Sequence, residues 1–334
     1  MKLQVNIKVI LFIMLISFNV FNTKAQQDAL YTQFMFNKLP QNAGYTGSKE
    51  GLSIRALYRD QWTSKNGNAI DGAPKTTCFS IHSPFKKESF ALGFYFINDR
   101  LGLEQKNQFD ITYAYRVALG KKVKLSIGIN AGLLWYKLNA TDAILVNPDD
   151  PKYRSNVSRV LPDVGAGLYI SHPNFYIGLS VPNFIKGQLA NKGDHSSTAK
   201  RTAHFVAMTG GLIPLGKSLK IRPQLQYCYL ASAVQKVPHT FSFNLSLLIF
   251  DKVNIGAQYH TAFQPKNKES KTENPDSFDF MLEIWPTKHL IIGYSYDYTL
   301  SKLANISNGS HEIILGYDFA SKSKKKQSAS ISYF

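Results

Sequence analysis

The sequence predicts an all-β fold, a transmembrane outer-membrane β-barrel of about fourteen antiparallel strands. Three observations predict it: an export signal at the N-terminus, many short segments that alternate between apolar and polar residues, and a regular succession of long and short connections. The composition agrees, because 18 Tyr and 22 Phe against only 3 Trp and 5 Met favour sheet surfaces and membrane interfaces over helices.

Residues 1–25 are typical of a cleaved secretory signal peptide. Lys2 and Lys8 precede an apolar stretch at residues 9–18, and the small residues near Ala25 form a site that a signal peptidase can cleave. This stretch is shorter than the roughly 20 residues that a spanning helix needs. The junction carries no cysteine for lipid attachment. We therefore expect export and cleavage, which leave a strongly basic mature chain.

Residues 26–50 are predicted to form a periplasmic leader, and residues 51–334 the barrel. The leader carries Tyr31, Phe34 and Phe36, and its aromatic content argues against free disorder. We expect it to plug the lumen from the periplasmic side or to dock a periplasmic partner. A flexible leader is the alternative.

Alternation with period two predicts the strands. In residues 109–117 the odd positions are apolar or aromatic and the even ones are small, polar or charged, and residues 125–133, 241–247 and 253–259 repeat the pattern. A soluble sandwich also alternates. Small residues and scattered charges on the polar face, with strand lengths near the roughly 9–11 residues that cross a bilayer, favour a membrane barrel. Because backbone groups must be paired in lipid, the sheet must close.

The connections set the number and direction of the strands. Long connections are predicted near residues 60–74, 98–106, 138–161, 183–200, 231–237, 264–276 and 299–308. Short turns are predicted near 85–88, 120–122, 172–174, 215–217, 251 and 286–288. Outer-membrane barrels have long external loops and short periplasmic turns. The succession therefore predicts about fourteen strands, with both termini on the periplasmic side.

Charged residues on the polar faces predict a lumenal charge cluster. If Ile54 and Tyr58 face lipid, then Arg55 and Arg59 face the lumen. The same alternation turns the carboxylates of the last strands inward, namely those of Asp279, Glu283, Asp297, Glu312 and Asp318. Because the first and last strands adjoin in a closed barrel, we expect these charges to meet across the seam, fix closure and narrow the lumen. A water-filled porin wall with solvated charges is the alternative.

Binding is predicted for the external loops, because loops on a rigid scaffold carry recognition. Their aromatic and basic side chains are of the types that often anchor interfaces: Trp62, Tyr153, Arg154, Phe184 and Lys186. The basic mature chain is expected to meet anionic lipopolysaccharide and lipid headgroups rather than nucleic acid.

Catalysis is not predicted. The pairs His82–Ser83 and Ser310–His311 do not have the spacing of a nucleophile elbow. The sequence also indicates no acidic residue that would complete a catalytic triad with either pair. The histidines lack metal-ligand spacing, and residues 147–151 lack the ligand pattern of a calcium loop. We therefore expect no enzyme, cofactor or metal site. Cys78 and Cys228 lie in separate predicted strands and are expected to stay unpaired.

Several motifs resemble one family in their order along the chain. They stand at residues 31–37, 42–47, 58–62, 72–76, 125–128, 162–169, 178–181, 293–297 and 309–313. Together they resemble the PorP/SprF outer-membrane proteins of the type IX secretion system, found in gliding and other Bacteroidota. Ala43 departs from the family's usual proline, which puts in doubt only the conformation of that entry segment.

The resemblance implies a noncatalytic secretion accessory that assists export or cell-surface anchoring of large cargo, such as adhesins with a C-terminal sorting domain. It also implies contact with the type IX translocon or a periplasmic complex, and a role in gliding motility. An outer-membrane porin or hydrophobic-solute transporter is the alternative function, because a barrel with small lumenal residues also suits diffusion.

Overall fold

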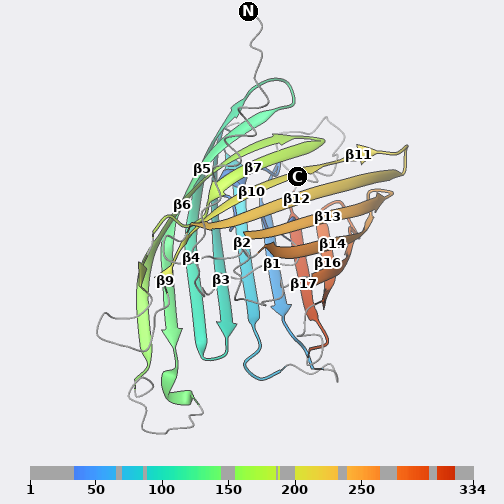
Figure 1. Cartoon of the computed structure of the whole chain (residues 1–334). Coiled ribbons are helices and arrows are strands. Elements are labelled where there is room, and N and C mark those ends of the chain that lie inside the picture. The colour runs from blue at the N-terminus through green and yellow to red at the C-terminus, as the bar shows by residue number, and fades with distance from the viewer. Residues whose placement is uncertain are drawn as a thin grey trace, which may run out of the picture.

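The computed structural model describes residues 34–64, 70–85, 89–143, 155–185, 187–188, 200–231, 239–263, 277–300 and 307–319. Their long strands form a closed, fourteen-stranded antiparallel β-barrel (Figure 1). The predicted fold class is therefore confirmed. The predicted signal peptide at residues 1–25 lies outside the described residues.

Fourteen strands of 7–16 residues build the wall. In chain order they are β1 Ser53–Asp60, β2 Lys75–Phe85, β3 Phe90–Leu101, β4 Glu104–Ala118, β5 Lys124–Leu138, β6 Val157–His172, β7 Phe175–Val181, β10 Ala203–Gly211, β12 Leu219–Ala231, β13 His239–Ile249, β14 Val253–Phe263, β15 Ser277–Ile284, β16 Leu290–Thr299 and β17 Ser310–Asp318. The shorter elements are η1 Ala43–Tyr45, η2 Ala140–Asp142, β8 Gly187–Gln188, β9 Lys200–Arg201 and β11 Ile213–Pro214.

Each long strand pairs with its neighbours in the chain, and the first strand pairs with the last. β1 lies beside β17 (Figure 1), in a register that runs from Ser53 opposite Asp318 to Asp60 opposite His311. β10 joins β7 on one side and β12 on the other. Closure leaves the barrel wall without a free edge, as the bilayer requires.

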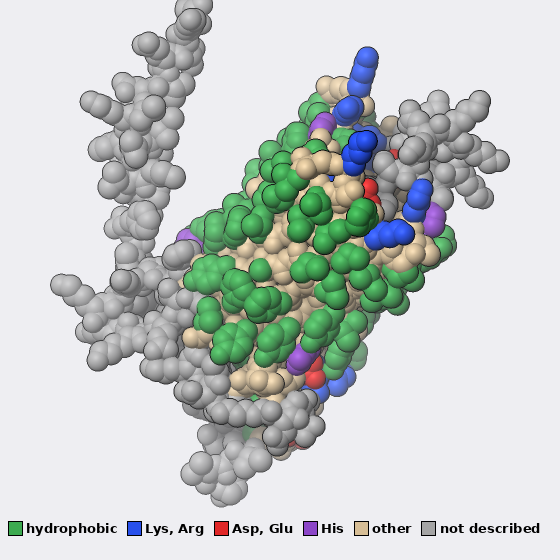
Figure 2. Space-filling model, turned by 90° about the vertical axis from the view of Figure 1, so that its right-hand side faces the viewer, with side chains coloured by type: hydrophobic (Ala, Val, Ile, Leu, Met, Phe, Trp, Pro, Cys, Tyr) green, Lys and Arg blue, Asp and Glu red, His purple; other side chains and the backbone are tan. Residues whose placement is uncertain are grey.

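The outer face of the barrel is apolar. On β4, Ile111 is 63% exposed while the adjacent Asp110 and Thr112 are buried, and the other strands alternate in the same way. On the face shown in Figure 2, hydrophobic side chains cover most of the barrel, and the charged side chains lie toward its ends. This placement of side chains is the reverse of that in a soluble protein, because the apolar face meets lipid and the polar face turns inward. Among the described residues, no helix is long and apolar enough to cross a membrane.

One predicted long connection is wrong. Residues 98–106 were expected to form a loop, but β3 continues to Leu101 and β4 begins at Glu104. The polar residues there pair across the two strands: the Asn98 side-chain amide donates to Asn107 Oδ1 at 2.7 Å. Gly102 adopts a φ of 55°, which allows the tight turn.

Candidate functional site

Residues 34–50, which we call the inner segment, lie inside the barrel. Phe34, Leu39 and Asn42 are at most 1% exposed, and η1 lies against the inner faces of β4, β5, β6 and β7. Phe36 of this segment is partly buried. Tyr31, the third aromatic residue that was predicted to plug or dock, lies outside the described residues.

Apolar and aromatic side chains fix the two ends of the inner segment. Phe34 packs near Met281 of β15. Tyr45 makes edge contacts with the rings of His82 and Tyr169, at centroid distances of 5.3 and 5.4 Å. Lys38 places its Nζ 3.7 Å from the centroid of the Tyr176 ring, within cation–π range. The segment therefore contacts opposite parts of the wall.

Asn42 bonds the centre of the inner segment to the wall. Its Nδ2 donates to the Leu168 carbonyl at 3.1 Å and to the Leu179 carbonyl at 3.4 Å. Its Oδ1 accepts the Gly44 N–H at 2.8 Å and so caps η1. These bonds join the segment to β6 and β7.

Small residues on the wall make room for the inner segment. A Cβ atom on Gly128 would clash with the carbonyl of Ala43, and one on Gly167 would clash with the side chain of Asn42. The small lumenal residues that the sequence offered as a channel wall are thus the surface against which η1 packs.

The last turn of the inner segment is bonded to β2 and β4. The Gly47 N–H donates to His82 Nδ1 at 3.0 Å, and the Gly47 carbonyl accepts from Arg116. Thr46 Oγ1 donates to Thr112 Oγ1 at 2.9 Å. Each such buried bond contributes about 1 kcal/mol. Together with Asn42, they hold the segment from several sides.

The seam between the first and last strands carries two ion pairs. Arg55 Nη1 lies 2.8 Å from Asp318 Oδ1 of β17, and Arg59 Nη2 lies 3.0 Å from Asp297 Oδ2 of β16. Both arginine side chains are at most 8% exposed. The structure thus brings together both predicted arginines with two of the five predicted carboxylates.

Of the other three predicted carboxylates, two also stand near the seam: Glu312 is opposite Arg59 in the β1–β17 register, and Asp279 is opposite Asp297 in the β15–β16 register. Glu283 pairs with Arg222 of β12 at 3.1 Å, across two intervening strands. Asp279 accepts a hydrogen bond from Gln258 at 2.9 Å. Glu312 is buried on β17. The predicted cluster is therefore a broader lining of buried charges, and alternation along β12 could have added Arg222 to it.

A further buried ion pair was missed at the sequence level. Arg201 of β9 lies 2.9 Å from Asp163 of β6, and their side chains are 5% and 0% exposed. Gln108 also donates to Asp163. Arg201 stands just after the predicted loop at residues 183–200, where no alternation indicates which way a side chain points.

The predicted loop anchors are only partly described. Trp62 follows β1, and its backbone N–H donates to Ser310 Oγ at 3.4 Å, next to the seam. Phe184 follows β7 and is 48% exposed. Tyr153, Arg154 and Lys186 lie outside the described residues.

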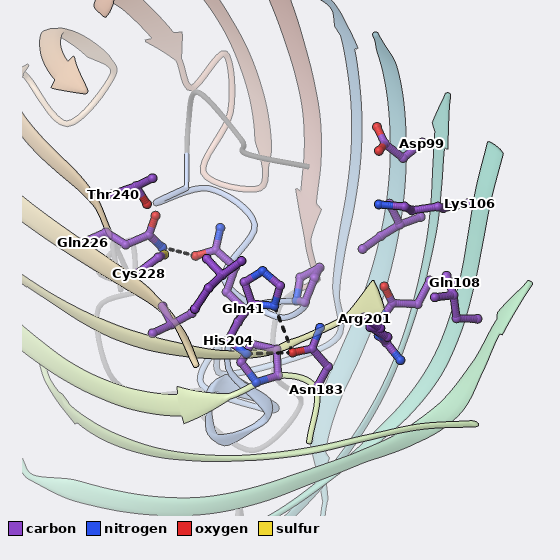
Figure 3. A pocket seen from close by; sticks show the side chains of 16 residues that line it. Gln41, Asp99, Lys106, Gln108, Asn183, Arg201, His204, Gln226, Cys228 and Thr240 are labelled. Atoms are coloured by element: carbon purple, nitrogen blue, oxygen red, sulfur yellow. Dashed lines mark hydrogen bonds between the residues drawn. The ribbon is translucent and has the colours of Figure 1, made fainter. Parts of the chain in front are cut away.

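A cavity of about 120 Å³ remains between the inner segment and the wall. Pro40 and Gln41 of the inner segment line it. Its walls come from strand ends beside the long connections, where Asn183, Arg201, His204 and Gln226 surround Gln41 (Figure 3). Two groups of hydrogen-bonded side chains line it: Gln226 donates to Gln41, and Asn183 Oδ1 lies 3.1 Å from His204 Nδ1.

Metal-ligating side chains do not gather in the described part of the chain. There, no group of three or more His, Cys, Asp or Glu side chains could hold a metal ion. Cys78 is buried on β2, Cys228 is partly exposed on β12, and neither forms a disulfide. The arrangement offers binding surfaces and buried charges.

The chain is similar in sequence to one family and in fold to several membrane barrels. The family described as type IX secretion system membrane protein PorP/SprF matches residues 23–317. No curated protein matches in sequence. The CymD monoaromatic hydrocarbon channel is 13% identical, with a TM-score of 0.51 over 87% of this chain and 93% of that one.

Two further solved barrels are more distant in shape. The outer-membrane protein Omp33 of Acinetobacter baumannii has a TM-score of 0.43 at 10% identity, over 82% of this chain and all of that one. A FadL homologue of Pseudomonas aeruginosa has a TM-score of 0.45 at 10% identity, over 80% and 90% of the two chains. The closed barrel, its apolar outer face and the family match support an outer-membrane location.

Proposed function

Because the chain belongs to the PorP/SprF family of type IX secretion system membrane proteins, we propose that it is a noncatalytic accessory barrel of that system. It assists export of large cargo, such as adhesins with a C-terminal sorting domain, and anchors them at the cell surface. The external loops bind the cargo. Periplasmic or translocon components bind the opposite end, and lipid and lipopolysaccharide surround the wall.

One observation carries this proposal beyond the family match: the inner segment occupies the lumen. Asn42, Gly47 and Tyr45 each contact the wall from inside. A barrel filled in this way suits a scaffold whose function lies at its rims. The inner segment is thus proposed to be a plug, the first of the two roles expected for residues 26–50.

The alternative function, a porin or hydrophobic-solute transporter, requires a continuous path through the barrel. The likeness to the CymD channel is a likeness of fold alone. The inner segment is hydrogen-bonded to β2, β4, β6 and β7, so a solute would have to pass a segment that is fixed to the wall. Conductance of the intact protein in planar bilayers would favour this alternative.

Deletion of the gene followed by a census of surface proteins tests the proposal. We expect one or a few very large secreted proteins to disappear from the surface, and re-expression of the intact chain to restore them. A gliding assay on the same strains tests whether the cargo contributes to motility. An unchanged surface in the deletion strain would contradict the proposed function.

A further inference from the structure

The cavity beside the inner segment has an apolar wall that the bilayer does not explain. Leu134, Val206 and Leu230 line it and are at most 6% exposed. Their outward neighbours Leu133 and Phe205 are 51% and 46% exposed and face lipid. Alternation therefore gives these strands apolar residues on both faces at this level. Val206 and Leu134 belong to apolar clusters of the chain itself, and the cavity borders the part of this wall that those clusters leave open.

The cavity lies at the end of the barrel that carries the long connections. Asp99 and Lys106 flank the tight β3–β4 turn, and Asn183 follows β7. Leu230 stands near the end of β12, and Thr240 near the start of β13. Pro40 and Gln41 of the inner segment also line the cavity. A ligand would thus reach it from the side of the proposed cargo loops.

The charges around the cavity are balanced. Arg201 pairs with Asp163 at 2.9 Å. Lys106 stands directly opposite Asp99 in the β3–β4 register. Because Arg201 is paired with an acid and Lys106 stands across from one, the wall favours an uncharged ligand over an ionic one.

The remaining polar groups suit a peptide backbone. Carboxamides of Gln41, Gln108, Asn183 and Gln226 lie in the wall, with the hydroxyl of Thr240. Carboxamides both donate and accept hydrogen bonds, as main-chain amides do. The volume, about 120 Å³, is close to that of an apolar cavity of about 150 Å³ that holds a benzene molecule.

We propose that this cavity receives one uncharged aromatic or branched aliphatic side chain from an extended segment of the secreted cargo. The side chain packs against the apolar wall, and the carboxamides form hydrogen bonds with the main chain on either side of it. A buried aromatic or aliphatic anchor of this kind commonly carries much of the affinity of an interface. The inference rests on the proposed function and names the recognition element within it.

The first test uses the purified full-length mature protein in detergent micelles. Cys228 is partly exposed and lines the cavity, so its alkylation by iodoacetamide reports occupancy. Cys78 is 0% exposed and serves as an internal reference. The probes are capped tripeptides of the form acetyl-Gly-X-Gly-amide, in which X is Phe, Leu, Ala or Asp. Mass spectrometry resolves the two cysteines.

We expect the Phe or Leu peptide to slow alkylation of Cys228 by about fivefold at several times its dissociation constant. The Ala and Asp peptides should leave the rate unchanged. Equal rates with all four peptides, or a Cys228 that does not react at all, would overturn the inference. Protection by free toluene without protection by any peptide would also overturn it, and would indicate a site for small hydrocarbons.

The second test fills the cavity in cells. Leu134→Trp places a larger ring inward, and Leu133→Trp is the matched control on the lipid face of the same strand. We expect the first variant to lose surface cargo by roughly tenfold or more, as removal of a buried anchor would, and the control to keep it. Heat-modifiable mobility in electrophoresis verifies folding, and Val206→Phe is a second filling variant if Leu134→Trp does not fold.

The outcomes separate the two proposals. If the gene deletion removes cargo while the folded filling variants retain it, the cavity inference fails and the proposed function stands. If the deletion changes no surface protein, the proposed function fails. The peptide experiment then decides alone whether the cavity binds an apolar side chain.

Discussion

Arg59 on β1 and Asp297 on β16 form an ion pair of 3.0 Å although β17 lies between their strands. The residue directly opposite Arg59 on β17 is Glu312, and Asp297 stands opposite Asp279 on β15. A single arginine therefore lies among carboxylates from the last three strands. The seam is joined by charge on its inner face as well as by backbone hydrogen bonds.

Removing this arginine should destabilise the barrel strongly. Arg59→Ala leaves Asp297 buried without its cation, and loss of one partner of a buried pair costs about 3–5 kcal/mol. The free energy of unfolding is measured by urea titration of the protein in lipid vesicles. Lys220→Ala is the control, because Lys220 and Asp251 form a part-exposed pair with side chains that are 22% and 45% exposed, and such a pair contributes at most about 1 kcal/mol. Equal losses in the two variants would contradict the importance of the seam.

Deleting the inner segment should open the lumen. A chain without residues 34–50 is expected to conduct ions in planar bilayers, whereas the intact chain is expected to be silent. The physical reason is that these residues occupy the inside of the barrel and are bonded to several strands. Heat-modifiable mobility verifies that the shortened chain still forms a barrel. A folded, shortened barrel that remained silent would mean that wall side chains alone close the lumen.

A single added side chain should displace the inner segment. Gly128→Val puts atoms where the Ala43 carbonyl lies, so η1 can no longer pack there. We expect faster proteolysis of residues 34–50 and a free energy of unfolding that is lower by roughly 1–3 kcal/mol. Gly120→Val is the matched control, because a Cβ on Gly120 would meet nothing within 4 Å. Equal protease resistance of the Gly128 variant and the native protein would refute this packing.

A charge on the outer face should lower the free energy of unfolding strongly at the middle of a strand and only slightly at its end. Ile111 stands halfway along β4 and is 63% exposed, whereas Leu119 lies in the following turn and is 59% exposed. Ile111→Arg is expected to lose roughly 2–4 kcal/mol in lipid and Leu119→Arg at most about 1 kcal/mol. Urea titration in vesicles measures both. Similar costs would mean that the two positions lie at similar depths.

Alternation allowed the inward and outward faces to be predicted, because it is a local property of the chain. In the structure Arg55 and Arg59 are buried, and closure brings them to the last strands. The pairing of Glu283 with Arg222 could not be predicted in the same way, because β12 and β15 are separated by two strands. Contacts across a lumen depend on barrel size and strand register, which no single strand encodes.

The path of the inner segment was equally beyond local reasoning. Its aromatic residues indicated burial, but Asn42, whose hydrogen bonds reach two strands, resembles any polar residue of a loop. The small residues Gly128 and Gly167 were visible, yet they suit an open channel wall as well as a packing surface. Only the assembled wall distinguishes these two uses.

The inner segment also has consequences for assembly. It is made before any strand of the barrel, yet Asn42 bonds to a carbonyl 137 residues later in the chain, and Gln41 accepts from Gln226, which is 185 residues later. Such distant partners make folding slow, because long loops must be ordered before the contacts that reward them can form. The inner segment, which precedes all the strands in the chain, can therefore reach its final position only after strands far along the chain have formed. Until those strands are in place, the inner segment has no wall to pack against.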